Sequence, residues 1–373
     1  MKPLINLPAL RRPLIRPLLK GKAAGKAAGK AAGKAAGKAA GNGNVSDGVH
    51  ADESLSLSLS LSLSLSLSLR AFSDDALLRA WRKVRANGGG PGVDGEDLRR
   101  FESRLRANLA KLREDLLSGT YRPRPVLRVL VPKASGGRRP ISILAVRDRV
   151  AQRAAHDVLA PLFEPRFLDC SYGFREGRST RLAVQAVIRH RDAGLRFAVD
   201  GDIKRCFENI DHALLMQFVA REVHDRLMLD LIRKWLKARV FNDMSSPSPD
   251  QMRGAAAAGV EGVEEVGALQ GSAMSPLLCN VYLHPFDAAM ARAGYALVRY
   301  ADDWLILCRD EGASRRALAD ATRALSELKL AVNPYRTRIA RFDEGFAFLG
   351  AFFIRDEHFW LSPQAGPKPK ESS

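Results

Sequence analysis

The chain has 373 residues, with 59 Lys and Arg against 41 Asp and Glu, which gives a formal net charge of +18 and a pI near 10.1. Such a basic chain is attracted to polyanions, most commonly nucleic acid, although a basic surface that meets only solvent would give the same composition. Four scattered cysteines without a CxxC pair argue against a disulfide scaffold and a cysteine-based zinc site. No globular segment has the roughly 18 or more apolar residues of a membrane span. We therefore expect a cytoplasmic protein with no membrane partner.

The first 70 residues have low complexity and are set apart from the fold. Residues 21–41 repeat a Gly-Lys-Ala-Ala unit, which is typical of a flexible basic tail. Residues 54–69 alternate Ser and Leu with the period of a strand, a pattern also typical of aggregation-prone edges. We expect residues 1–70 to form a disordered tail, residues 71–355 one globular unit, and residues 356–373 a short C-terminal tail.

The globular part begins with helices and a basic hairpin. Apolar residues at helical spacing predict one helix near residues 74–87 and a second over residues 96–117, separated by a glycine-rich break. Two strands follow around a turn at 135–137, with Lys133 and Arg139 near its base. A basic hairpin suits binding of a triphosphate or a nucleic-acid backbone. A hairpin made soluble by its charges explains this stretch equally well.

Aspartates follow apolar strands at two distant places. One strand ends in Asp200 and Asp202, where a carboxylate can hold a cation or cap a helix. In LVRYADDWLILC, two apolar runs flank Asp302 and Asp303, which predicts a short hairpin with both carboxylates at its tip. The alternative is a turn whose aspartates bond only to their own backbone. If Asp202 joins the pair at one sheet edge, the three acids can bind Mg²⁺, and two such ions support phosphoryl transfer.

An ordered series of motifs extends this picture. The motifs are GGGPGVDG from residue 88, VPKASGGRRPISIL from 131, YGFREGR from 172, DIKRCFENIDH from 202, GALQGSAMSP from 267, YADD from 300, AVNPYRTRIA from 331 and GFAFLGAFF from 345. The series resembles reverse transcriptases of the group II intron type, over about residues 72–355. The resemblance implies an α+β right-hand polymerase, with fingers at about 72–195 and a ferredoxin-like palm at about 196–355.

The resemblance also implies roles for individual residues. Two Mg²⁺ ions, or Mn²⁺, would be held by Asp202, Asp302, Asp303 and the backbone carbonyl of Ile203. Residues expected to bind the nucleotide are Lys133, Arg139, Phe207, Gln270, Gly271 and Arg336. Phe207 would lie under the sugar, and Arg175 and Arg178 would contact nucleic acid.

The chain departs from the family pattern at several positions. Arg205 replaces a small residue, and Leu269 and Ser272 replace a Pro and a Gly around Gln270. Arg336 stands where a Lys is frequent, which keeps the charge but not the ability to donate a proton. Only 20 residues follow residue 353, too few for a helical thumb. Either the chain is truncated or a partner protein supplies a thumb-like grip.

The expected activity is RNA-templated DNA synthesis, in which deoxynucleoside triphosphates extend a DNA or RNA primer on an RNA template. Two alternatives stay open. One is an RNA-binding splicing helper without catalysis, which would not need the three acids. The other is an RNA-templated RNA polymerase, against which Phe207 argues because its ring would meet a ribose 2′-hydroxyl. A mobile intron, CRISPR spacer acquisition and other antiviral defence all fit this core, and we favour a host role.

Overall fold

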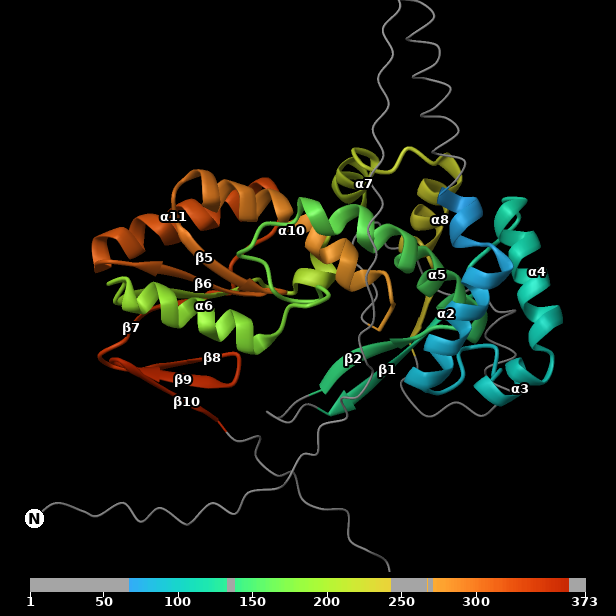
Figure 1. Ribbon diagram of the computed structural model, residues 1–373, viewed down its shortest axis with the longest axis horizontal. Coiled ribbons are helices and arrows are strands. Elements are labelled where there is room, and N and C mark those ends of the chain that lie inside the picture. Colours follow the sequence, from blue (N-terminus) through green and yellow to red (C-terminus); the bar gives the residue numbers. More distant parts are fainter. Residues whose placement is uncertain (1–66, 133–137, 243–266, 268–270, 362–373) are drawn as a thin grey trace, which may run out of the picture. The chain divides into compact units, whose positions relative to one another are not determined.

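Groups of helices and groups of strands follow one another along the described chain (Figure 1). The computed structural model describes residues 67–132, 138–242, 267 and 271–361. The helices are α2 (Asp74–Asn87), α3 (Leu98–Ser103), α4 (Leu105–Leu117), α5 (Val146–Phe163), α6 (Thr180–Asp192), α7 (His212–Ala220), α8 (Arg226–Leu236), α10 (Ser275–Arg292) and α11 (Glu311–Glu327), with short 3₁₀ turns η1 (Glu164–Arg166) and η2 (Cys206–Asn209). This mixture confirms the expected α+β class.

A four-stranded antiparallel sheet has the predicted ferredoxin-like topology. Its strands are β3 (Phe197–Asp202), β5 (Ala296–Tyr300), β6 (Asp303–Cys308) and β7 (Arg338–Arg341). Their order in the sheet is β5-β6-β3-β7, and every neighbouring pair is antiparallel. Helices separate β3 from β5, and α11 separates β6 from β7. The central strands β3 and β6 each end or begin at an aspartate, so this sheet carries the acids that the sequence singled out.

Alternating side chains bury both faces of this sheet. Val199 and Ile306 pack into the same cluster as Ala321 of α11, whereas Ala198 and Leu305 pack with residues of α6. Figure 1 shows α11 and α6 on opposite sides of the sheet. A strand covered on both faces needs a continuous apolar run, which explains the sequence WLILC in β6.

The N-terminal helices pack beside a second, smaller sheet. Strands β1 (Val126–Pro132) and β2 (Arg138–Ile143) form the predicted hairpin, and β4 (Val240–Asn242) pairs parallel with β1. The single helix expected over 96–117 is wrong, because Arg104 leaves the helical conformation (φ −125°, ψ 30°) and separates α3 from α4. The side-chain amide of Asn108 donates to the carbonyl of Phe101 across this break, at 2.9 Å. The ring of Phe101 packs on Trp81, with 5.1 Å between centroids.

The folded unit starts earlier than the expected boundary at residue 71. Residues 67–71 are helical, although the Ser-Leu alternation has the period of a strand. The amide of Ser68 donates to Asp225 Oδ2 at 2.7 Å, and Asp225 also caps α8 by accepting from the Met228 amide. Ala71 and Phe72 are fully buried. Tertiary contacts with α8 thus decide the local conformation here, against the sequence pattern.

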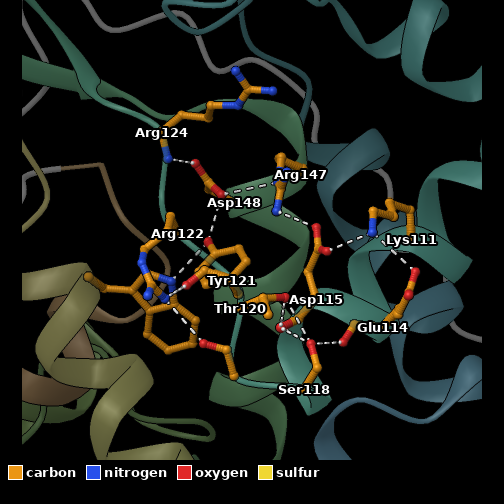
Figure 2. A network of polar contacts seen from close by, with 12 residues as sticks. Lys111, Glu114, Asp115, Ser118, Thr120, Tyr121, Arg122, Arg124, Arg147 and Asp148 are labelled. Carbon is orange, nitrogen blue, oxygen red and sulfur yellow. Dashed lines mark hydrogen bonds and ion pairs between the residues drawn. The ribbon is translucent and has the colours of Figure 1, made fainter.

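A buried polar network ties the segment after α4 to α5 and α8 (Figure 2). The hydroxyl of Tyr121 donates to Asp148 Oδ1 at 2.6 Å and accepts from the Trp235 indole at 3.1 Å. The second oxygen of Asp148 accepts from the Arg124 amide at 2.8 Å. Burial raises the pKa of Asp148 to about 6, even though these hydrogen bonds favour its charged form. The network therefore contains a carboxylate that costs free energy when ionised.

This carboxyl predicts a pH dependence of stability. Asp titrates near 3.9 in an unfolded chain, so the folded state binds its proton more tightly. The contribution of protonated Asp148 to the free energy of unfolding is fully present below about pH 4 and is lost as pH rises through about 6. For a pKa difference of this size, that contribution is about 3 kcal/mol. Urea denaturation of the wild type and of Asp148→Asn between pH 4 and 7 tests this. The fall in stability should be smaller for the variant, and parallel profiles would contradict the assignment.

The described chain ends in a small three-stranded sheet that follows β7. It has the order β10-β9-β8, from β8 (Phe346–Phe348), β9 (Ala351–Ile354) and β10 (Glu357–Trp360). Phe346 stacks on Phe353 with 5.4 Å between ring centroids. These strands form the hairpin expected from GFAFLGAFF. No helix in the described ranges is both long and apolar enough to span a bilayer.

Candidate active site

The three predicted acids lie at one edge of the palm sheet. Strands β5 and β6 form a hairpin with Ala301 and Asp302 in the turn and with Tyr300 paired to Asp303. This confirms the predicted hairpin. On the other side of β6, Asp303 pairs directly with Asp202, the last residue of β3. The amide of Ile203 then donates to the carbonyl of Asp302 at 3.3 Å. Two strands about 100 residues apart in sequence thus bring the carboxylates together.

Burial and mutual repulsion disfavour the charged forms of two of these acids. The pKa of Asp303 is raised to about 6, first by burial and then by the charges of Asp302 and Asp202. The pKa of Asp302 is also raised, mainly by burial, with the charge of Asp202 adding to it. Such a cluster gains stability from any cation placed among its members.

Arg336 supplies such a positive charge from the segment before β7. Its guanidinium lies 2.7 Å from Asp202 Oδ1 and 3.8 Å from Asp303 Oδ1. The other oxygen of Asp202 accepts from the side-chain amide of Asn333 at 2.8 Å. Because 64% of the Arg336 side chain is exposed, it can move without disturbing the core. The predicted neighbour of the nucleotide thus contacts the acids themselves.

Carboxylate oxygens are ligands that suit a hard divalent cation. Among the residues that the structure describes, no three His, Cys, Asp or Glu side chains already surround a common metal position. The donor chemistry fits, and an ion bound by Asp202 and Asp303 would compete with Arg336 for their carboxylates.

A large cleft opens in front of these acids. Its volume is about 1200 Å³, and Asp202, Asp302, Phe207 and Arg336 line one part of it. The cleft is also lined by the glycines after α2 and by side chains of α5, namely Gly88, Gly89, Gly90, Arg149, Arg153 and His156. The cleft therefore joins a cluster of acids to a basic wall.

Of the other residues expected to bind the nucleotide or the metal, some line the cleft and some lie outside the described part of the chain. Gly271 lines the cleft. Arg139 lies in β2, paired with Val131, and its side chain is outside the described part. Lys133 and Gln270 lie outside the described residues. Ile203 lines the cleft beside Asp202.

The guanidinium of Arg175 is buried within the protein. Its side chain is only 4% exposed. Its guanidinium donates to Glu164 and to the carbonyls of Leu168 and Ser171, both at 2.7 Å. All of its nitrogen atoms thus have acceptors within the protein, which corrects the expected contact. Arg178, by contrast, stays partly exposed and pairs with Asp169 at 2.5 Å.

A buried arginine supports the acidic hairpin and was not identified from the sequence. Arg299 of β5 is fully buried, and it binds both oxygens of Asp287 at 2.6 Å. It also donates to Asn280, to the hydroxyl of Ser171 and to the carbonyl of Ala301, at 2.8–3.1 Å. The last contact fixes the turn that carries Asp302. A charged residue inside the apolar strand ALVRY was the available signal, because such a residue must find buried partners.

Two glycines allow close approach to the acid-bearing strands. A Cβ atom on Gly201 would lie 2.2 Å from the ring of Trp304, which covers it from the neighbouring strand. A Cβ atom on Gly173 would lie 2.4 Å from the amide nitrogen of Ala301. The loop before α6 therefore packs directly against the turn, and Ala301 there holds a positive φ of 59°.

The chain is similar to several known proteins. A family model described as reverse transcriptase (RNA-dependent DNA polymerase) matches residues 131–353. Protein YkfC of Escherichia coli (strain K12) is 32% identical over 71% of this chain and 76% of its own length. The group II intron-encoded protein LtrA of Lactococcus lactis subsp. cremoris is 35% identical over 48% of this chain and 27% of LtrA. The structure of telomerase from Candida albicans with a telomeric RNA fragment has 12% identity and a TM-score of 0.48, over 71% of this chain and 50% of that one.

The matches differ in how much of each protein they cover. The family model covers more than half of the chain and includes all three acids. YkfC is matched over most of its length, whereas the match to LtrA spans about a quarter of that protein. The chain belongs to the reverse transcriptase (RNA-dependent DNA polymerase) family and, within it, to the group II intron type.

Proposed function

We propose that the chain extends a primer 3′-hydroxyl with deoxynucleotides on an RNA template, using two Mg²⁺ ions, or Mn²⁺, held by Asp202, Asp302, Asp303 and the Ile203 carbonyl. The observation that carries this proposal is the meeting of the three carboxylates at one sheet edge. When bound, the ions would activate the hydroxyl and stabilise the leaving pyrophosphate.

The residues around the acids have supporting roles in this proposal. Asn333 orients Asp202 through its side-chain amide, and Arg299 fixes the turn that carries Asp302. Lys133, Arg139, Gln270, Gly271 and Arg336 would contact the nucleotide, and Arg178 the nucleic acid. The position of Gly271 and Arg336 in the cleft is consistent with these roles.

Primer extension by the purified chain on an RNA template tests the proposal. We expect deoxynucleotides to be added only when a divalent cation is present. An RNA-binding splicing helper would bind the template and add nothing. An RNA polymerase would prefer ribonucleotides. Either result would contradict the proposal.

The Phe207→Ala variant should accept ribonucleotides more readily. Phe207 is partly buried, lines the cleft and follows Asp202 by five residues. Loss of its ring opens space beside the sugar, so the ratio of kcat/KM for a deoxynucleotide over its ribonucleotide should fall. Partial unfolding affects both substrates equally and cancels from this ratio.

The matched control is Phe218→Ala. Phe218 is also partly buried, but it packs on Tyr282, 6.0 Å between ring centroids, and does not line the cleft. Its loss should leave the ratio unchanged. If Phe207→Ala behaves in the same way and only loses roughly 3–5 kcal/mol of stability, Phe207 is a core residue.

Binding to a primer–template should weaken steeply with salt. The chain carries a net charge of +18, and release of counterions from phosphates gives a slope of about −0.9 per phosphate neutralised in a plot of log affinity against log salt. Affinity measured between low and physiological salt tests this. Nearly constant affinity would show that contacts other than charge dominate. We also predict a partner protein that holds the duplex as a thumb would. Without such a partner, primer extension by the chain alone should give short DNA products.

A further inference from the structure

Phe174 has a strained backbone and presents its ring to the cleft. Its φ is +61°, a region that bulky residues rarely occupy. Its side chain is not buried to compensate, because 50% of the residue is exposed. It lines the same cleft as Asp202 and Asp302. A strained and exposed aromatic residue beside reacting groups calls for a functional explanation.

The chain on both sides of Phe174 is held firmly enough to maintain this conformation. The carbonyl of Gly173 accepts from the Asn280 side chain at 2.8 Å, and Gly173 packs against the backbone of Ala301. On the other side, Arg175 anchors its guanidinium to Glu164 and to buried carbonyls. These anchors leave Phe174 little freedom to relax and keep its ring in the cleft.

The ring meets Phe207. The two ring centroids are 6.3 Å apart at an angle of 75°, which is an edge-to-face contact. Phe207 lies in the four-residue turn η2, which begins after Arg205, another residue with positive φ (48°). One part of the Phe207 side chain packs against the buried core, and another part lines the cleft, where it meets Phe174. The edge of Phe174 therefore limits where the ring of Phe207 can lie.

We propose that Phe174 is a second determinant of sugar specificity, which holds the Phe207 ring in the position that excludes a ribose 2′-hydroxyl. The proposal rests on the proposed function and on the sugar-facing role of Phe207. Exclusion of one hydroxyl depends on ring placement to within about 1 Å. A side chain that fixes the ring can therefore set the specificity as strongly as the ring itself.

The experiment compares four proteins with the wild type: Phe174→Ala, Phe207→Ala, the double variant, and Phe359→Ala. Phe359 is the matched control, because it is 52% exposed and lies on β10, outside the cleft. The measurement is the ratio of kcat/KM for a deoxynucleotide over its ribonucleotide in primer extension. We expect Phe174→Ala to lower this ratio by roughly tenfold or more, on the scale of apolar pocket contacts. The double variant should be no less specific than Phe207→Ala, since both changes act through one ring.

A stability measurement separates this role from a purely structural one. Glycine adopts a φ of 61° without strain, so Phe174→Gly should unfold at a urea midpoint no lower than that of Phe359→Ala while losing specificity like Phe174→Ala. A clearly lower midpoint with an unchanged substrate ratio would make Phe174 a structural residue and overturn the proposal.

The remaining outcomes are distinct from one another. No extension by the wild type overturns the proposed function and this inference with it. If the wild type extends the primer but Phe207→Ala leaves the deoxynucleotide-to-ribonucleotide ratio unchanged, Phe207 does not face the sugar. The inference about Phe174 then fails as well, because it depends on that role. A ratio lowered by Phe207→Ala but not by Phe174→Ala overturns the inference alone. Additive losses in the double variant would also overturn it, because the rings would then act independently.

Discussion

Asp302→Asn and Asp303→Asn are each expected to fold at least as stably as the wild type and to lose primer extension by several orders of magnitude. The pKa of both carboxyls is raised, first by burial, so their charges oppose folding and an amide relieves this cost. The same charges are what a divalent cation requires. Gain of stability together with loss of activity is typical of a site kept for chemistry.

Extension rates per active molecule and urea denaturation measure the two effects. Asp343→Asn is the control, because Asp343 is an exposed acid that pairs with Arg341 at 3.9 Å. It should leave both measurements unchanged. Extension at wild-type rates by both Asn variants would refute the metal-binding assignment.

Arg299→Met should destabilise the fold severely. The substitution leaves Asp287 fully buried without the two 2.6 Å hydrogen bonds that Arg299 donates to it. Removing one member of a buried ion pair costs roughly 3–5 kcal/mol, mainly because the remaining charge is uncompensated. The contact to the carbonyl of Ala301 is also lost, so the acidic turn loses its support.

A second change separates these two consequences. Arg299→Met combined with Asp287→Leu removes both charges, and apolar pairs often replace buried ion pairs at little cost. We expect the double variant to regain much of the stability but not the extension rate. Arg196→Met is the control, because its pair with Asp356 is exposed, and exposed ion pairs contribute little to stability. If Arg299→Met lost no more stability than Arg196→Met, the interpretation of Arg299 as part of a buried ion pair would be contradicted.

The palm and its acids could be predicted because their signals are local. Apolar alternation marks β3, a continuous apolar run marks β6, and an aspartate next to such a stretch is conspicuous. Features set by distant partners could not be predicted in this way. Residues 67–71 are helical beside Asp225, the N-cap of α8, and Arg175 is buried because acceptors gather around it. The positive φ of Phe174 likewise follows from anchors on other elements.

The contact between Gly201 and Trp304 limits how this polymerase can be engineered. The indole lies where any side chain at position 201 would have to go. Position 201 sits between two acids on the central strand, so it would otherwise be an attractive site for altering the reaction centre. A library that varies residue 201 alone should therefore yield almost no folded members. Folded variants at position 201 should appear only when Trp304 is replaced by a smaller residue in the same protein. The two positions therefore have to be varied together.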